Sequence, residues 1–156
     1  MGTPGTLTHK YPSLGNFQMK IRGDFPRIYM SATSATNNAK LRSINQWGDI
    51  QWMSMEYAFI NATNLQILAT DTPNLSKVTS MYGMFYNATN LTGNFSGWDT
   101  SKVTNMSYMF YNAANFNQDI SSRIVHANSN FTYFLSGVNL SSYNYNALLD
   151  SRSRQS

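Results

Sequence analysis

The sequence contains no cysteine and little charge. The absence of cysteine excludes a disulfide-stabilised scaffold and a cysteine-ligated zinc site. Charged residues make up 12% of the 156 residues, and no apolar run approaches the roughly 18 residues of a membrane-spanning helix. The start of the chain also lacks the basic and apolar regions of a signal peptide. A chain of 156 residues is long enough for one domain with a modest core.

The ionisable residues are too few and too scattered for catalysis or metal binding. The two histidines, His9 and His126, lie far apart, and Glu56 is the only glutamate. A hydrolase needs a carboxylate pair, or a nucleophile with a base, and a metal site needs clustered ligands. We therefore expect no enzyme activity, no cofactor and no metal. The spread aspartates, such as Asp99 and Asp119, are expected to cap turns.

Positive charge is equally dispersed. The 11 Lys and Arg residues give a net charge of +4, but they do not form the cluster that nucleic-acid binding requires. We therefore expect no nucleic-acid partner and no membrane span. Aromatic residues, at 14%, are too abundant for a disordered polar chain.

A repeated segment is the strongest positive signal. "SKVTSMYGMFYNATNL" at 76–91 and "SKVTNMSYMFYNAANF" at 101–116 are nearly identical. The units are marked by Phe59, Phe85, Phe110 and Phe134, at spacings of 26, 25 and 24. One unit cannot bury its own apolar face, whereas stacked copies can. We therefore expect the four phenylalanines to form one buried column, with Val78 against Val103 and Met81 against Met106.

Within each unit the apolar residues recur at helical spacing. The pattern comprises Val78, Met81, Met84 and Phe85 in one unit and Val103, Met106, Met109 and Phe110 in the next. It predicts a short α- or 3₁₀-helix in each unit. The "NATN" or "NAAN" that follows supplies turn residues, and "LTGNF" and "FNQDI" predict short strands. The turn asparagines are expected to stack as a ladder, each amide bonding the equivalent backbone of the next unit.

The flanking segments predict caps. Phe17, Met19 and Ile21 alternate with polar residues, which predicts a half-buried strand within an N-terminal β cap at 15–43. Residues 1–14 are expected to be a flexible leader or an appended segment. The four repeats occupy 44–140. In 141–156, a serine N-cap (Ser141 or Ser142) before an apolar stripe predicts a cap helix followed by a tail.

The third unit and its flanks, "WDTSKVTNMSYMFYNAANFNQDIS" at 98–121, resemble the repeat of BspA-like leucine-rich-repeat surface proteins. That repeat reads approximately W-D-V-S-x-V-T-x-M-x-x-M-F-x-x-A-x-x-F-N-x-D-I-S. The resemblance covers roughly residues 15–151 and departs at Arg123, where a tryptophan is usual. It implies an α/β fold: a short leucine-rich-repeat-like solenoid of about four coils of 24–26 residues, with an N-terminal β cap and a C-terminal helical cap. It also implies adhesion or protein binding, without catalytic residues.

Tyrosines between the apolar positions are the candidate binding residues. The set is Tyr82, Tyr86, Tyr108 and Tyr111. If the apolar side chains point inward, these rings either form exposed rows suited to gripping protein or glycan, or pack between the repeats. The first case predicts an extracellular or cell-surface adhesion module whose partner is a protein or glycan on another cell.

A virion structural protein is the alternative. A capsid decoration or tail component would reach the outside without a secretion signal, and a surface rich in Asn, Ser and Thr suits wet contacts between subunits. Its partners would be neighbouring subunits of the assembly. This alternative predicts that the chain ends pack against other chains.

Overall fold

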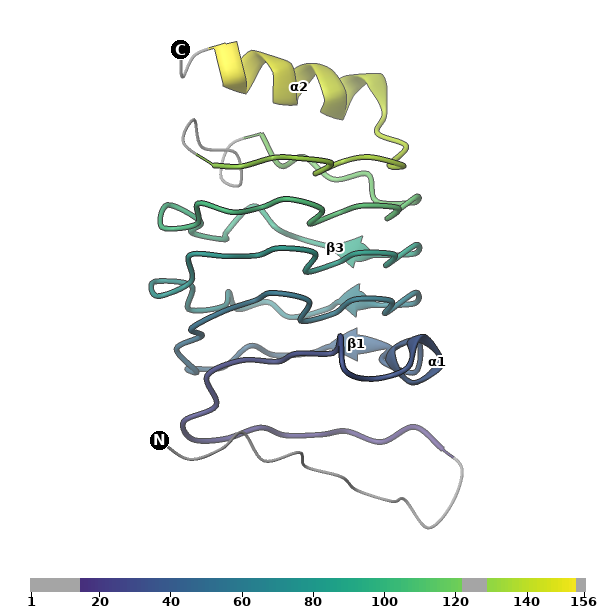
Figure 1. Ribbon diagram of the computed structural model, residues 1–156, viewed down its shortest axis with the longest axis vertical. Helices are drawn as coiled ribbons and strands as arrows, with labels where there is room; N and C mark the ends of the chain where they lie inside the picture. The colour runs from purple at the N-terminus through teal and green to yellow at the C-terminus, as the bar shows by residue number, and fades with distance from the viewer. Residues whose placement is uncertain (1–14, 122–128, 154–156) are drawn as a thin grey trace.

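The computed structural model describes residues 15–121 and 129–153, and the following applies to that part of the chain. It contains α1 (Ala35–Asn38), β1 (Ser43–Ile44), β2 (Gln66–Ile67), β3 (Thr92–Gly93) and α2 (Ser142–Ser153). The strands form one open parallel sheet in the order β1-β2-β3. The three strands lie one above another, and α2 lies across the C-terminal end of the molecule (Figure 1).

The expected fold class is wrong. An α/β leucine-rich-repeat-like solenoid of four coils should carry a strand and a helix in each coil, but the described residues form one small three-stranded sheet and two short helices. Each strand is two residues long, and neither helix falls in the "VTSMYGMFY" or "VTNMSYMFY" segments. "LTGNF" contains β3, whereas "FNQDI" contains no strand.

The backbone explains why the repeated segments are turns and not helices. Gly83 and Tyr108 have φ of 57° and 58°, values that a right-handed helix does not accommodate. Alternate N–H groups donate to the neighbouring repeat: Met81 to Asn105 at 2.8 Å, and Phe85 to Met109 at 2.8 Å. The intervening N–H groups close short turns within the unit, as Met84 does with Met81. In this structure, the apolar residues at helical spacing therefore lie on a series of short turns and not on a helix.

The buried phenylalanines only partly follow the expected column. The rings of Phe59 and Phe85, and of Phe85 and Phe110, stack with centroids 5.6 Å apart in both cases. Phe134 is buried and meets Phe110 edge-on at 5.3 Å. However, the Phe110 N–H bonds the Phe134 carbonyl, whereas the Phe85 N–H bonds the Met109 carbonyl. Leu135, not Phe134, is therefore the backbone equivalent of Phe110, and the expected register of Phe134 is wrong by one residue, although the Phe134 ring is the one that contacts Phe110.

The other expected pairs lie in register. Ser80 bridges Asn105, which aligns Met81 with Met106, and both methionines are fully buried. Val78 and Val103 are buried in the same core. The Asn112 N–H bonds the Ser136 carbonyl, which aligns Asn112 with Gly137 at a repeat spacing of 25. The Asn139 N–H bonds the Ala114 carbonyl, which aligns Asn139 with Asn115 at a spacing of 24. One residue is thus missing from the last repeat, after its phenylalanine.

The turn asparagines form two ladders through their side chains. In the first, Asn87 Nδ2 donates to Asn61 Oδ1 at 3.0 Å, and Asn112 Nδ2 donates to Asn87 Oδ1 at 3.2 Å. The second ladder joins Asn64, Asn90 and Asn115 in the same direction. The expected ladder is present, but its side-chain amides bond one another and not the neighbouring backbone. The first ladder also uses a left-handed backbone, since its three members have φ of 55° to 58°.

Gly137 ends the first ladder. It lies one repeat beyond Asn112 and also has a positive φ, of 78°. A Cβ atom at Gly137 would require the Asn112 amide to turn away, and glycine itself carries no amide to continue the column. The ladder therefore stops where the last repeat begins to shorten.

The N-terminal segment departs from the expected β cap. Phe17, Met19 and Ile21 are 45%, 70% and 42% exposed, and no strand precedes β1 within residues 15–42. The alternating pattern has no neighbouring strand to pair with, so it forms irregular chain. Further along, Met53 N–H donates to the Pro26 carbonyl, which joins this segment to the first repeat.

The C-terminal helix is confirmed. α2 begins where expected, because the Asn144 N–H bonds Ser141 Oγ at 3.3 Å. Leu148 is buried against the core, whereas Tyr145 and Leu149 are about half exposed. Residues 1–14, the flexible-leader prediction, and 154–156 lie outside the described residues.

Aspartates cap turns, as expected. Asp99 accepts the Ser101 N–H at 3.0 Å, and Asp119 accepts the Ser121 N–H at 2.9 Å. Asp71 reaches across to the preceding repeat and accepts the N–H groups of Trp47 and Gly48 at 3.0 and 2.8 Å. Partial burial acts to raise the pKa of Asp71, but these backbone hydrogen bonds outweigh it and lower the pKa below its ordinary value of 3.8.

Asp71→Ala is expected to lower stability by about 1–2 kcal/mol at pH 7, because two backbone donors lose a charged acceptor at a partly exposed site. A lowered folded-state pKa means that the contribution is present above the ordinary value of 3.8 and is lost as pH falls through the folded pKa. In chemical unfolding, the deficit of the variant relative to the parent should therefore be largest at pH 7 and should shrink progressively as the pH is lowered below 3.8. Asp49→Ala is the matched control, and a pH-independent deficit in the Asp71 variant would contradict this assignment.

Candidate functional site

A row of tyrosine rings crosses the repeats on one face of the molecule. Tyr57 lies 5.1 Å from Tyr82, Tyr82 lies 5.5 Å from Tyr108, and Tyr108 lies 5.0 Å from Tyr133, measured between ring centroids. Tyr29 extends the row at 6.0 Å from Tyr57. We call these five residues the tyrosine row. Each ring comes from a different chain segment, so the stacking of the repeats produces the row.

A shorter second row lies beside the first. Tyr86 and Tyr111 stack with centroids 4.8 Å apart and ring planes 13° from parallel. Tyr108 joins the two rows, at 6.4 Å from Tyr86 and 5.7 Å from Tyr111. The two rows together are called the tyrosine face. The expected binding residues Tyr82, Tyr86, Tyr108 and Tyr111 are thus gathered on this face, and each is half-buried.

The backbone of the row is strained at three of its members. Tyr57, Tyr108 and Tyr133 have φ of 51°, 58° and 53°, a conformation that is uncommon for bulky residues. Gly83 occupies the matching place in the second repeat. A Cβ atom there would lie 2.8 Å from Cε1 of Tyr57, so the Tyr57 ring covers Gly83, and the ring of this repeat comes from Tyr82 instead.

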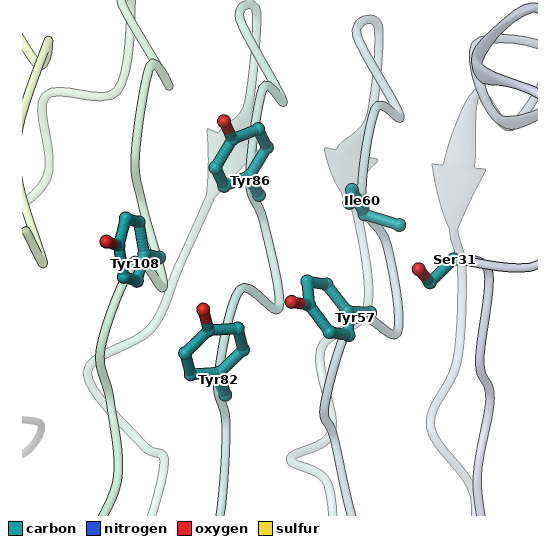
Figure 2. A pocket seen from close by; sticks show the side chains of 6 residues that line it. All are labelled: Ser31, Tyr57, Ile60, Tyr82, Tyr86 and Tyr108. Carbon is teal, nitrogen blue, oxygen red and sulfur yellow. The ribbon is translucent and has the colours of Figure 1, made fainter.

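A cavity opens between the two rows. Its volume is about 450 Å³, and its lining comprises Ser31, Tyr57, Ile60, Tyr82, Tyr86 and Tyr108. Figure 2 shows the four rings reaching the cavity from three neighbouring chain segments, with Ile60 and Ser31 closing the side nearer the N-terminus. No charged side chain contributes to the lining.

Comparison with protein families places the chain. The family model described as "Mycoplasma protein of unknown function, DUF285" matches residues 28–148. The chain belongs to the DUF285 family. The matched range contains the tyrosine face from Tyr29 to Tyr133. No curated protein and no solved structure matches the chain.

Two hydroxyl groups of this DUF285 face, those of Tyr57 and Tyr108, have raised pKa values. Burial, a hydrogen bond with Tyr82 and the nearby charge of Glu56 raise the pKa of Tyr57 to about 12. Partial burial and the surrounding tyrosines also raise the pKa of Tyr108. The face therefore offers aromatic rings together with hydroxyl groups.

The described part of this DUF285 chain contains neither a metal-binding cluster nor a membrane-spanning helix. No group of three His, Cys, Asp or Glu side chains in residues 15–121 and 129–153 could hold a metal ion. His9 and His126 lie outside those residues. Within the same ranges, no helix combines the length and apolarity needed to cross a membrane.

Sequence reasoning missed Tyr29, Tyr57 and Tyr133. A signal for Tyr57 was available, because Tyr57 precedes Phe59 by two residues just as Tyr108 precedes Phe110. Tyr133 lies 25 residues after Tyr108 and has the same backbone conformation. Tyr29 had no such signal, since it precedes the repeats and reaches the row only through the path of the N-terminal segment.

Proposed function

We propose that the chain is a non-catalytic surface binding module that holds a protein or glycan against its tyrosine face. The observation that carries the proposal is the continuous row of rings across five chain segments, with neighbouring centroids 5.0 to 6.0 Å apart. Tyrosine is enriched in binding sites because its ring supplies contact area and its hydroxyl a hydrogen bond.

The rigidity of the face supports the same proposal. The rings contact one another and have few rotatable bonds, so little side-chain entropy remains to be lost on binding. Positive φ at Tyr57, Tyr108 and Tyr133 costs about 1–2 kcal/mol per residue. Backbone strain of this kind concentrates at functional sites. A location on the cell surface follows from the resemblance to BspA-like proteins, which itself stays a prediction.

Changing Tyr82, Tyr86, Tyr108 and Tyr111 together to Ser should weaken binding to the target cell, protein or glycan at least about tenfold, as expected for aromatic hot spots. Binding of the full chain to intact cells and to glycan and protein arrays measures the effect. Tyr143→Ser, on α2 and 76% exposed, is the matched control.

A smaller variant guards against misfolding. Tyr86→Ser with Tyr111→Ser removes only the second row and should still reduce binding several-fold. Thermal melts of both variants check that they fold. A folded variant that binds as the parent does, or a parent that binds no target in any screen, would remove the support for this function.

The virion alternative depends on contacts of the chain ends. Those ends fall mostly outside residues 15–121 and 129–153, so a capsid or tail role stays an alternative prediction. Its test is the size of the particle in solution, where a monomer would contradict subunit assembly.

A further inference from the structure

The cavity in the tyrosine face has a lining of unusual chemistry. Four of its six lining residues are tyrosines, and the other two are Ser31 and Ile60. Its volume, about 450 Å³, lies in the range of small-molecule pockets. We propose that this cavity binds a quaternary ammonium group, of which the trimethylammonium of choline is the simplest example. The proposal does not depend on whether the wider face holds a protein or glycan.

Aromatic rings attract a cation through the negative potential of their faces, and quaternary ammonium groups are typical ligands of such aromatic cages. A trimethylammonium group has no N–H to satisfy, so rings and methylenes can replace its water. A metal ion would instead require carboxylate or carbonyl ligands, and the side chains of this lining carry no carboxylate. The chemistry of the lining therefore favours the methylated cation.

The tyrosine row already holds one cation. The guanidinium carbon of Arg27 lies 4.5 Å from the ring centroid of Tyr29, within the distance at which cation–π attraction operates. Tyr29 is the ring neighbour of Tyr57, which lines the cavity. The tyrosine row thus binds the Arg27 cation at Tyr29, the ring next to the Tyr57 ring of the proposed site.

A carboxylate strengthens the attraction. Glu56 precedes Tyr57, its Oε1 accepts the Ser80 hydroxyl at 2.7 Å, and its charge acts on the Tyr57 ring. The raised pKa values of Tyr57 and Tyr108 keep these two lining rings in their neutral form at physiological pH. Glu56 does not itself line the cavity, and the positive charge of Arg27 on Tyr29 opposes its effect, so the lining rings provide the main attraction.

A sugar is the less suitable occupant. Glycan sites combine ring stacking with amide or carboxylate partners that fix the sugar hydroxyls. No amide or carboxylate side chain is among the six residues that line the cavity, and the ladder asparagines Asn61, Asn87 and Asn112 use their amides to bond one another. A neutral ligand of the same shape as choline therefore provides the decisive comparison.

The test is calorimetric or NMR titration of the full chain with choline chloride and with 3,3-dimethylbutan-1-ol, its uncharged carbon isostere. We expect choline to bind at least tenfold more tightly than the isostere. Equal affinity for the two compounds, or no detectable choline binding, would overturn the proposal. Co-sedimentation with phosphatidylcholine vesicles that choline displaces would identify a lipid head group as the source, and choline binding without co-sedimentation would identify a soluble ligand.

Three single variants locate the site. Tyr86→Phe keeps the ring and should retain choline affinity within about threefold, whereas Tyr86→Leu should lose at least tenfold. Tyr143→Leu changes an exposed ring on α2 that belongs to neither tyrosine row, so it should leave choline binding unchanged. A folded Tyr86→Leu protein that binds choline as the parent does would contradict the aromatic cage.

Discussion

Phe110→Ala is expected to lower the free energy of unfolding by about 3–5 kcal/mol, as for other fully buried phenylalanines. The Phe110 ring is wholly buried and stacks on Phe85 at 5.6 Å and on Phe116 at 4.2 Å. Its removal would leave a cavity between two repeats that the hydrogen bonds of the neighbouring backbone prevent from collapsing. Chemical denaturation of parent and variant measures the loss.

Met19→Ala is the control, since the Met19 side chain is 70% exposed and its truncation should change stability by no more than about 0.5 kcal/mol. A Phe110 variant that unfolds at the same denaturant concentration as the parent would show that the stacked column does not hold the repeats together.

Gly93→Ala is expected to cost about 3–5 kcal/mol, from two causes acting at one residue. Gly93 ends β3 with a φ of 144°, a region open essentially to glycine alone. An added Cβ would also lie 2.5 Å from Cβ of Ile67 and 2.9 Å from its carbonyl oxygen, so the sheet would have to open. The melting temperature should fall steeply, and part of the protein should be recovered as aggregate.

Gly48→Ala separates the two causes. Gly48 has a φ of 68° but nothing within 4 Å of an added Cβ, so only backbone strain applies, at about 1–2 kcal/mol. Equal losses in the Gly93 and Gly48 variants would mean that the close approach of β2 and β3 contributes nothing.

The repeat register could be read from the sequence because one phenylalanine recurs in a nearly constant motif. The spacing placed Phe59, Phe85 and Phe110 in one column, and the serine before the last apolar stripe placed the start of α2. The last repeat was misaligned at Phe134 because its missing residue follows the phenylalanine, where no motif residue marks the loss. Only the backbone pairing reveals it.

The secondary structure within the repeats could not be predicted in the same way. Apolar residues three apart fit a helical face, but they fit a series of short turns equally well. A helix forms only if each backbone N–H bonds the carbonyl four residues earlier. In this protein, carbonyl groups of the neighbouring repeat accept many of those N–H groups instead. Similarly, alternation at Phe17, Met19 and Ile21 signals a strand only if a partner strand exists, which local sequence does not specify.

The candidate site was predictable in part. The four tyrosines chosen from the sequence share one face because the repeats are in register. The sequence did not show that Tyr82, and not the residue at position 83, supplies the ring of the second repeat. That replacement depends on the Tyr57 ring of the preceding repeat, which lies over Gly83. The cavity was hidden for the same reason, because three repeats and the N-terminal segment build it together.

The glycine that ends the first asparagine ladder restricts how such a chain could lengthen during evolution. Gene duplication that inserted a further unit between Asn61 and Asn112 would continue the amide chain with one more donor and one more acceptor. The same unit added after Gly137 would find no amide to join, and a larger residue at 137 would require the Asn112 amide to turn away. Longer relatives built from this unit should therefore have gained their additional copies internally, with the shortened last unit retained as the terminus.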